Sequence, residues 1–248
     1  MTPAEIRFFE ELTLNSSGAL KQIFYDGWIL RFSPGSNTKR ANSVTALYAS
    51  TQSIDAKLAY CETTYAYEGM LTRFRVSEFS DPPYLDTHLA ACGYDKVDST
   101  LFMLCDLEKH GTVSSSLDVK QLAINDWLQI NHALRGDTKE TIAAHRSRLE
   151  SISLRHFPIA CFINGEPVSM GLGIQQDNYF GLFDIFTPKN ERGKGYGRLI
   201  TQHLMQLAHQ EQARFAFLQV EEHNKAQQIY KAVGFEAVYR YWYRVKNN

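Results

Sequence analysis

The stretch FDIFTPKNERGKGYG, from Phe183 to Gly197, decides how this chain folds. Its first residues are bulky and apolar, which favours a buried β-strand, and Pro188 ends regular pairing because proline lacks a backbone donor. From Arg192 to Gly197 every second residue is glycine, and the apolar residues that follow recur at helical spacing. The stretch therefore predicts a strand, a turn and a glycine loop that opens a helix.

A glycine loop at the start of a helix favours an anion. The first N–H groups of a helix have no partner within it, and the helix dipole is positive at that end. Glycine tolerates positive φ and lets a ligand approach the backbone, while Arg192, Lys194 and Arg198 add positive charge. A pyrophosphate fits this description. The simpler alternative is a glycine turn that caps a surface helix, since the pattern is neither a Walker loop nor the dinucleotide fingerprint.

A second motif lies downstream of this loop. Residues 214–220 (RFAFLQV) form another apolar strand, and N-x-A-x-x-x-Y-x-x-x-G-F follows from Asn224 to Phe235. The two motifs in this order resemble the acetyl-CoA site of the GNAT superfamily of N-acetyltransferases. The resemblance covers residues 180–245 and, more loosely, everything from Leu117 onward.

The N-terminal half repeats the order of elements in the C-terminal half. A strand, a helix ending in LAACGY (89–94) and a further strand are matched by the same order around YKAVGF (230–235). This parallel suggests an internal duplication, although strand–helix–strand units with a glycine cap are common. Residues 41–52, before the corresponding first-half helix, contain no glycine, so the first half would be a degenerate copy without a phosphate loop.

The expected fold is α/β (α+β), with tandem GNAT-like domains. Each domain would hold a mixed, mostly antiparallel central sheet flanked by helices. The expected boundaries are 1–107 for the degenerate N-terminal domain, 108–118 for the linker and 119–248 for the acetyltransferase domain. The linker is indicated by the small and polar composition of residues 109–116.

Composition limits the function classes. The net charge of −1 over 248 residues gives no basic excess for nucleic acid, and no apolar run approaches the length of a membrane span. The acidic N-terminus is unlike a signal peptide, and four scattered cysteines without metal-ligand spacing indicate free thiols. We expect a cytoplasmic protein without a metal, and the sequence leaves a homodimer open.

The resemblance assigns the cofactor-binding residues. It implies that the N–H groups of the glycine loop hold the pyrophosphate of acetyl-CoA and that a strand edge next to a β-bulge pairs with the pantetheine arm. Asn224 would hydrogen-bond that arm, or act as a helix N-cap, or both. The side chains of Lys194 and Arg198 have the alternative of a solvated helix start. The residues in these roles are Ile185, Phe186, Thr187, Arg192, Gly193, Lys194, Gly195, Tyr196, Gly197, Arg198 and Asn224.

Two residues are candidates for proton transfer. In the context of the Asn224 motif, Tyr230 is the expected general acid for the leaving thiolate, whereas by spacing alone it would be a core aromatic. Asp184 lies on an otherwise apolar strand, where a carboxylate needs a partner or a perturbed pKa, so it either removes the amine proton or orients the acceptor. Glu221, Glu222 and a water chain remain alternatives.

These residues predict direct transfer of an acetyl group from acetyl-CoA to a primary amine of a small molecule or peptide, in a ternary complex. The alternative is a non-catalytic acyl-CoA-binding sensor or scaffold. In the first case the N-terminal half would shape the acceptor cleft, with Arg31, Arg40, Asn42, Tyr65, Tyr67 and Glu68 as candidate lining residues.

Overall fold

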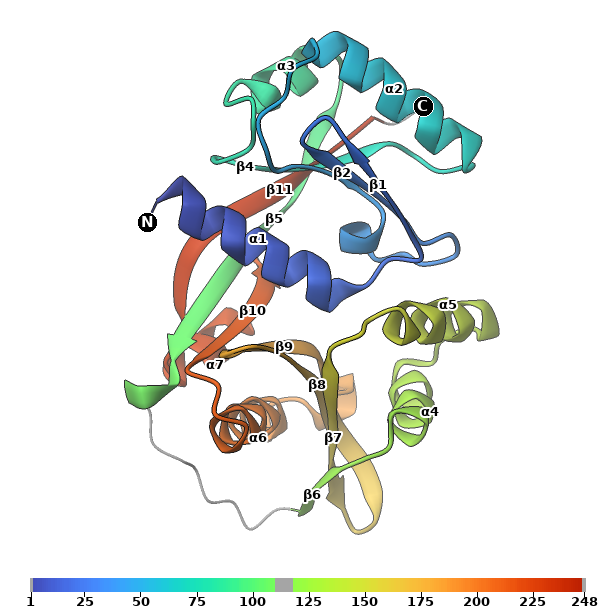
Figure 1. The fold of residues 1–248 in the computed structure, drawn as a ribbon. Helices are drawn as coiled ribbons and strands as arrows, with labels where there is room; N and C mark the ends of the chain where they lie inside the picture. Colours follow the sequence, from blue (N-terminus) through green and yellow to red (C-terminus); the bar gives the residue numbers. More distant parts are fainter. Residues whose placement is uncertain (1, 110–117, 247–248) are drawn as a thin grey trace. The chain divides into compact units, whose positions relative to one another are not determined.

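The computed structural model describes residues 2–109 and 118–246. They form two compact units that interleave along the chain (Figure 1). Unit 1 contains residues 2–101, 143–152 and 239–246, and unit 2 contains residues 102–109, 118–142 and 153–238. The division at 1–107 and 119–248 stays a prediction about the domains, and most of the expected linker lies outside the described residues.

Unit 2 is built on a meander of antiparallel strands that ends in a parallel pair. Its strand order is β5-β10-β9-β8-β7-β6, and β9 and β10 are the parallel neighbours. Its strands are β6 (Asp118–Gln121), β7 (Arg155–Ile163), β8 (Glu166–Gln176), β9 (Tyr179–Phe186), β10 (Phe215–Glu221) and the end of β5 (Asp95–Asp106). Its helices are α4 (Ile124–Arg135), the start of α5 (Lys139–Glu150), α6 (Tyr196–Gln210) and α7 (Gln227–Ala232), with short 3₁₀ turns at Leu107–Lys109 and Lys189–Glu191.

Helices cover both faces of the unit 2 meander. Figure 1 shows α6 on one side of β7, β8 and β9 and α4 on the other. Gly171 of β8 allows α6 to pack closely, because a Cβ at this position would lie 2.7 Å from Ile200 and 3.0 Å from Leu204. The hairpin between β7 and β8 turns at Asn164 and Gly165, whose φ values of 51° and 85° are those of a type I′ turn.

Unit 1 repeats this plan with shorter strands. Its order is β1-β2-β3-β4-β11-β5, and β3 and β4 form a parallel pair. The unit contains β1 (Lys21–Tyr25), β2 (Trp28–Phe32), β3 (Val44–Ala46), β4 (Arg73–Ser77), most of β11 (Glu236–Val245), α1 (Pro3–Ser17), α2 (Ile54–Tyr67), α3 (Leu85–Ala91) and a 3₁₀ turn at Lys39–Ala41. The sequence β3–α2–β4–α3–β5 thus parallels β9–α6–β10–α7–β11, which confirms the predicted tandem fold class.

The start of α2 carries a carboxylate of the chain itself, at the place that corresponds to the glycine loop of α6. Asp26 accepts hydrogen bonds from the backbone N–H groups of Thr51 and Gln52 at 3.0 and 2.9 Å. These backbone donors hold the pKa of Asp26 down at about 2. The buried ammonium of Lys57 lies 3.4 Å from the same carboxylate. In the first repeat, the place that corresponds to the glycine loop is therefore occupied by the Asp26 carboxylate.

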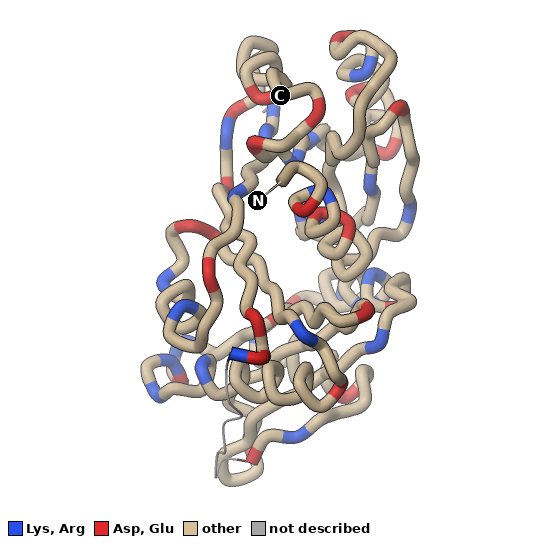
Figure 2. The backbone as a smooth tube through the Cα atoms, turned by 60° about the vertical axis from the view of Figure 1, so that its left-hand side comes forward, with Lys and Arg blue, Asp and Glu red and all other residues tan. Residues whose placement is uncertain are grey.

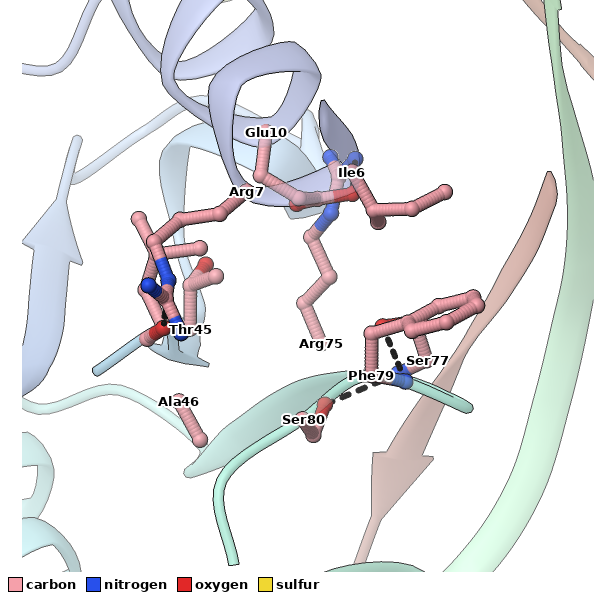
Figure 3. Close-up of a pocket in the computed structure, with 10 residues that line it drawn as sticks. Ile6, Arg7, Glu10, Thr45, Ala46, Arg75, Ser77, Phe79 and Ser80 are labelled. Atoms are coloured by element: carbon pink, nitrogen blue, oxygen red, sulfur yellow. Dashed lines mark hydrogen bonds and ion pairs between the residues drawn. The ribbon is translucent and has the colours of Figure 1, made fainter. Parts of the chain in front are cut away.

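The interior of unit 1 contains a second charged pair (Figure 3). Arg75 donates to the Glu10 carboxylate at 2.8 Å, and the Tyr239 hydroxyl donates to the same oxygen at 2.6 Å. Both charged side chains are 5% exposed or less. A pocket of about 10 Å³, room for one water molecule, lies beside this pair beneath α1. Glu10 thereby ties the first helix to β4 and to the last strand.

We predict that Glu10→Ala destabilises the protein by about 3–5 kcal/mol, because it leaves the Arg75 charge buried without its partner. Glu68→Ala is the matched control, since it removes a carboxylate paired with exposed Lys21 at 2.8 Å and is expected to cost less than about 1 kcal/mol. Urea unfolding of both variants measures the difference. Equal losses in the two variants would show that the buried pair contributes no more than a surface one.

Candidate active site

The central feature of the candidate site is a break in the pairing of β9. Along β8 and β9, Leu172 pairs with Phe183 whereas Met170 pairs with Phe186, so β9 has one extra residue in this interval. Asp184 lies inside it with a φ of 48°, the left-handed region that non-glycine residues rarely adopt. An extra residue with such a backbone is a β-bulge, which bends the strand.

The bulge coincides with the point where the two parallel strands separate. The pairing of β9 with β10 runs from Tyr179 opposite Phe215 to Leu182 opposite Leu218. Beyond this point β9 continues to Phe186 and β10 to Glu221. The pairing of β9 with β10 therefore stops at Leu182, and residues 183–186 have a described partner strand only on the β8 side.

The glycine loop lies at the same end of β9. Gly193 and Gly195 have φ values of 81° and 88°, and a Cβ on either would meet no atom within 4 Å. The first bond that closes α6 runs from Leu199 N–H to the Gly195 carbonyl at 3.1 Å, so the N–H groups of Tyr196, Gly197 and Arg198 precede the helical ladder. The loop thus offers unpaired donors beside open space, as an anion requires.

Neighbouring side chains organise this end of β9. The Ser169 hydroxyl donates to the Phe186 carbonyl at 3.0 Å, and Arg192 donates through Nε to the Thr187 carbonyl at 3.1 Å. Lys194 forms an ion pair with Glu191 at 2.9 Å, a bond that raises the pKa of the lysine. Arg192 is therefore turned toward the strand end, and the charge of Lys194 is partly neutralised. Arg198 is exposed on the first turn of α6.

The helix that carries Tyr230 packs against the start of α6. A Cβ on Gly197 would lie 3.8 Å from Ile229, the residue before Tyr230, and 3.6 Å from the Thr187 hydroxyl. Tyr230 is 9% exposed, and burial raises its pKa to about 12. Among the described residues, none makes a hydrogen bond with the Tyr230 hydroxyl. This side chain can therefore remain protonated and donate to a ligand.

Asn224 closes a local turn just before α7. Its side-chain oxygen accepts from the backbone N–H of Ala226 at 2.9 Å, where the chain turns into α7. The N-cap of α7 is Ala226, which has no side-chain cap bond, so Asn224 is not the N-cap of this helix. The role of its amide in ligand binding stays a prediction. Glu221 ends β10 and is exposed.

Asp184 has a partner that we did not predict. Arg135, in the last turn of α4, lies 3.6 Å from the Asp184 carboxylate and places its guanidinium 4.4 Å from the centre of the Phe186 ring. In the sequence Arg135 appears only as a basic residue before a glycine cap, the usual position for a charge that complements the helix dipole. Nothing local indicates that it reaches a carboxylate 49 positions away.

Three of the six first-half residues that we expected to line an acceptor cleft are buried instead. Arg31, Asn42 and Tyr65 are 2%, 0% and 0% exposed within unit 1. The Asn42 amide donates to loop carbonyls and the Tyr65 hydroxyl donates to the Arg31 carbonyl. These side chains satisfy backbone groups inside the unit, so they cannot line an open cleft.

Charge distribution, metal-ligand groups and helix hydrophobicity add three observations. Acidic and basic residues are interspersed along the backbone of both units (Figure 2). Within residues 2–109 and 118–246 no group of three or more His, Cys, Asp or Glu side chains is arranged to hold a metal ion. In the same residues no helix is both long enough and apolar enough to cross a membrane.

Comparisons with known proteins agree with this geometry. Residues 3–244 match the family described as "Probable histone acetyltransferase Rv0428c C-terminal". The chain is 29% identical to the uncharacterized N-acetyltransferase YobR of Bacillus subtilis, over 98% of this chain and 99% of that one. A GCN5-related N-acetyltransferase from Kribbella flavida shares the fold with a TM-score of 0.76, at 17% identity over 99% of this chain and 95% of the other. A tandem GNAT protein from the clavulanic acid biosynthesis pathway has a TM-score of 0.63, at 14% identity over 77% of this chain and 68% of its own.

We predict opposite effects for two glycines of the loop. Gly195→Ala should destabilise the protein by about 1–2 kcal/mol, because alanine is strained in the left-handed region. Gly197→Ala should be neutral or stabilising by up to about 1 kcal/mol, because Gly197 lies in the first turn of α6 with ordinary space at its Cβ position. Urea unfolding compares them. If both substitutions destabilise equally, the left-handed backbone of Gly195 is not what requires glycine.

Proposed function

Because the chain belongs to the family "Probable histone acetyltransferase Rv0428c C-terminal", within the GNAT superfamily of acetyltransferases, we propose that it transfers the acetyl group of acetyl-CoA directly to a primary amine in a ternary complex. The observation that carries this proposal is the divergence of β9 and β10 beside the open glycine loop of α6. An extended thioester fits such an opening, with its diphosphate at the loop.

Different residues of unit 2 would bind different parts of acetyl-CoA. Backbone N–H groups from Gly193 to Arg198 would hold the pyrophosphate, and the positive end of α6 adds to their attraction. The strand edge at Ile185, Phe186 and Thr187 would pair with the pantetheine arm. The amide of Asn224 would bind the same arm from the turn that follows β10. Bound acetyl-CoA supplies the thioester whose acetyl group is transferred.

The chemical step needs a proton removed and a proton supplied. The acceptor nitrogen forms its new bond to the acetyl carbon as the carbon–sulfur bond breaks. Tyr230 would donate its hydroxyl proton to the leaving thiolate. Asp184 would hold the acceptor amine at the bulge, and the amine proton would leave to this carboxylate or to water. Direct transfer needs no covalent enzyme intermediate.

A thiol-release assay with acetyl-CoA and a panel of amines and peptides tests the proposed function. We expect acceptor-dependent release of free coenzyme A, with acetylated product detected by mass spectrometry. Binding of coenzyme A by calorimetry is measured in parallel. A protein that binds coenzyme A but acetylates no amine in a broad panel would instead be an acyl-CoA sensor.

Tyr230→Phe should lower kcat by about 10²–10⁴ while leaving coenzyme A binding intact, because only the proton donor is lost. Tyr239→Phe is a suitable control, since it removes a hydroxyl that donates to Glu10 within unit 1. Steady-state kinetics on a single good acceptor give the comparison. Unchanged turnover in Tyr230→Phe would remove this residue from the chemistry.

The pH profile offers an independent check on Tyr230. Since burial raises its pKa to about 12, the hydroxyl stays protonated well beyond pH 10. We therefore expect no loss of kcat from this acid between pH 7 and pH 10, whereas an unperturbed tyrosine would be half ionised near pH 10. An alkaline loss centred near pH 10 that disappears in Tyr230→Phe would contradict the assignment.

A further inference from the structure

The ion pair between Arg135 and Asp184 is long, and both side chains are partly exposed to solvent. Its atoms are 3.6 Å apart, longer than the 2.7–2.9 Å that is typical of a direct charge-assisted hydrogen bond. The two side chains are 30% and 26% exposed. Both charges therefore remain accessible to a ligand at the bulge of β9.

Arg135 is held in place by groups other than Asp184. Its Nε donates to the side-chain oxygen of Asn131 at 2.5 Å, and Asn131 is fully buried in α4. Its guanidinium lies over the Phe186 ring at 4.4 Å. These two contacts fix the plane of the guanidinium, and its Nη2 lies 3.6 Å from Asp184 Oδ1. A planar, fixed guanidinium is the group that best binds a carboxylate through two parallel hydrogen bonds.

The pair also decides which acceptors fit. An ammonium that approaches Asp184 also approaches the Arg135 guanidinium, and this like charge disfavours a simple amine. An acceptor with a carboxylate beside its amine avoids this conflict, because its carboxylate meets Arg135 while its nitrogen meets Asp184. The two charges of the protein are then each matched by the opposite charge of the ligand.

We propose that the acceptor is a small zwitterion, an amine with a carboxylate one or two carbons away, as in a free amino acid. Arg135 binds the carboxylate and Asp184 positions the amine. This inference rests on the proposed function, since it assigns the acceptor of that same site. It distinguishes a free amino acid from the lysine side chain of a protein, which has no neighbouring carboxylate.

The test compares amino acids with their amides as matched acceptors. Alanine, leucine and phenylalanine are measured against alaninamide, leucinamide and phenylalaninamide, with protein loaded with acetyl-CoA. The amides differ from the amino acids in the basicity of the amine. We therefore divide kcat/KM for each amino acid by kcat/KM for its amide and compare this ratio between variants. Binding of the same six compounds to protein saturated with coenzyme A is measured by ligand-observed NMR, which does not depend on turnover.

We expect the wild-type protein to prefer the amino acids. Arg135→Gln should reduce kcat/KM for the amino acids about 10- to 100-fold, mainly through KM, as expected for the loss of charged hydrogen bonds, and should change the amides about threefold or less. Arg135→Lys should retain part of the preference because it keeps the charge without the planar fork. Arg155→Gln is the control, since Arg155 is also paired with a carboxylate, Glu211 at 2.7 Å, and also lies over an aromatic ring, Phe157.

Each outcome separates this inference from the proposed function. If amides react as well as amino acids and Arg135→Gln leaves the ratio unchanged, the zwitterion assignment is wrong while the acetyltransferase proposal stands. If no compound is acetylated although coenzyme A binds, the proposed function fails, and the NMR comparison decides the inference alone. Equal binding of amino acids and amides in that measurement would overturn it, and tighter binding of amino acids that Arg135→Gln abolishes would support it.

Discussion

One extra residue in β9 is the constraint on which the candidate site depends. In a regular sheet, β9 would pair with β10 to its end. The backbone N–H and C=O groups of residues 183–186 would then be hydrogen-bonded to neighbouring strands. The residue inserted between Phe183 and Phe186 interrupts the pairing with β8 and turns Asp184 into the left-handed region. Backbone strain of this kind costs of order 1–3 kcal/mol and persists where the surroundings maintain it. Here the Ser169 hydroxyl and the Arg135 guanidinium hold the two sides of the bulge.

The parts of this fold that the sequence predicted are those with local causes. The glycine loop depends on positive φ values at Gly193 and Gly195 that only a few residue types adopt, so its composition is diagnostic. The order of helices and strands follows from spacing alone. Tyr230 and Asn224 were identified through a motif that spans α7 and the turn before it, and their roles in catalysis and cofactor binding stay predictions.

The parts that the sequence missed depend on contacts between distant residues. No pattern around Arg135 indicates that its charge meets Asp184, and none around Glu10 indicates a partner on β4 and another on β11. The interleaving of the two units has the same origin, since β11 enters the unit 1 sheet beside β4 with Tyr241 opposite Ser77. Such pairings follow from how the whole chain closes, and short windows of sequence do not contain that information.

The carboxylate of Asp26 gives the two repeats unequal roles. It accepts the N–H groups of Thr51 and Gln52 at the entrance to α2 and is accompanied by the buried ammonium of Lys57. An anion tethered to the chain has no translational entropy to lose, so a free diphosphate competes with it poorly. Despite its doubled architecture, each polypeptide would then bind one equivalent of coenzyme A, at the second repeat alone.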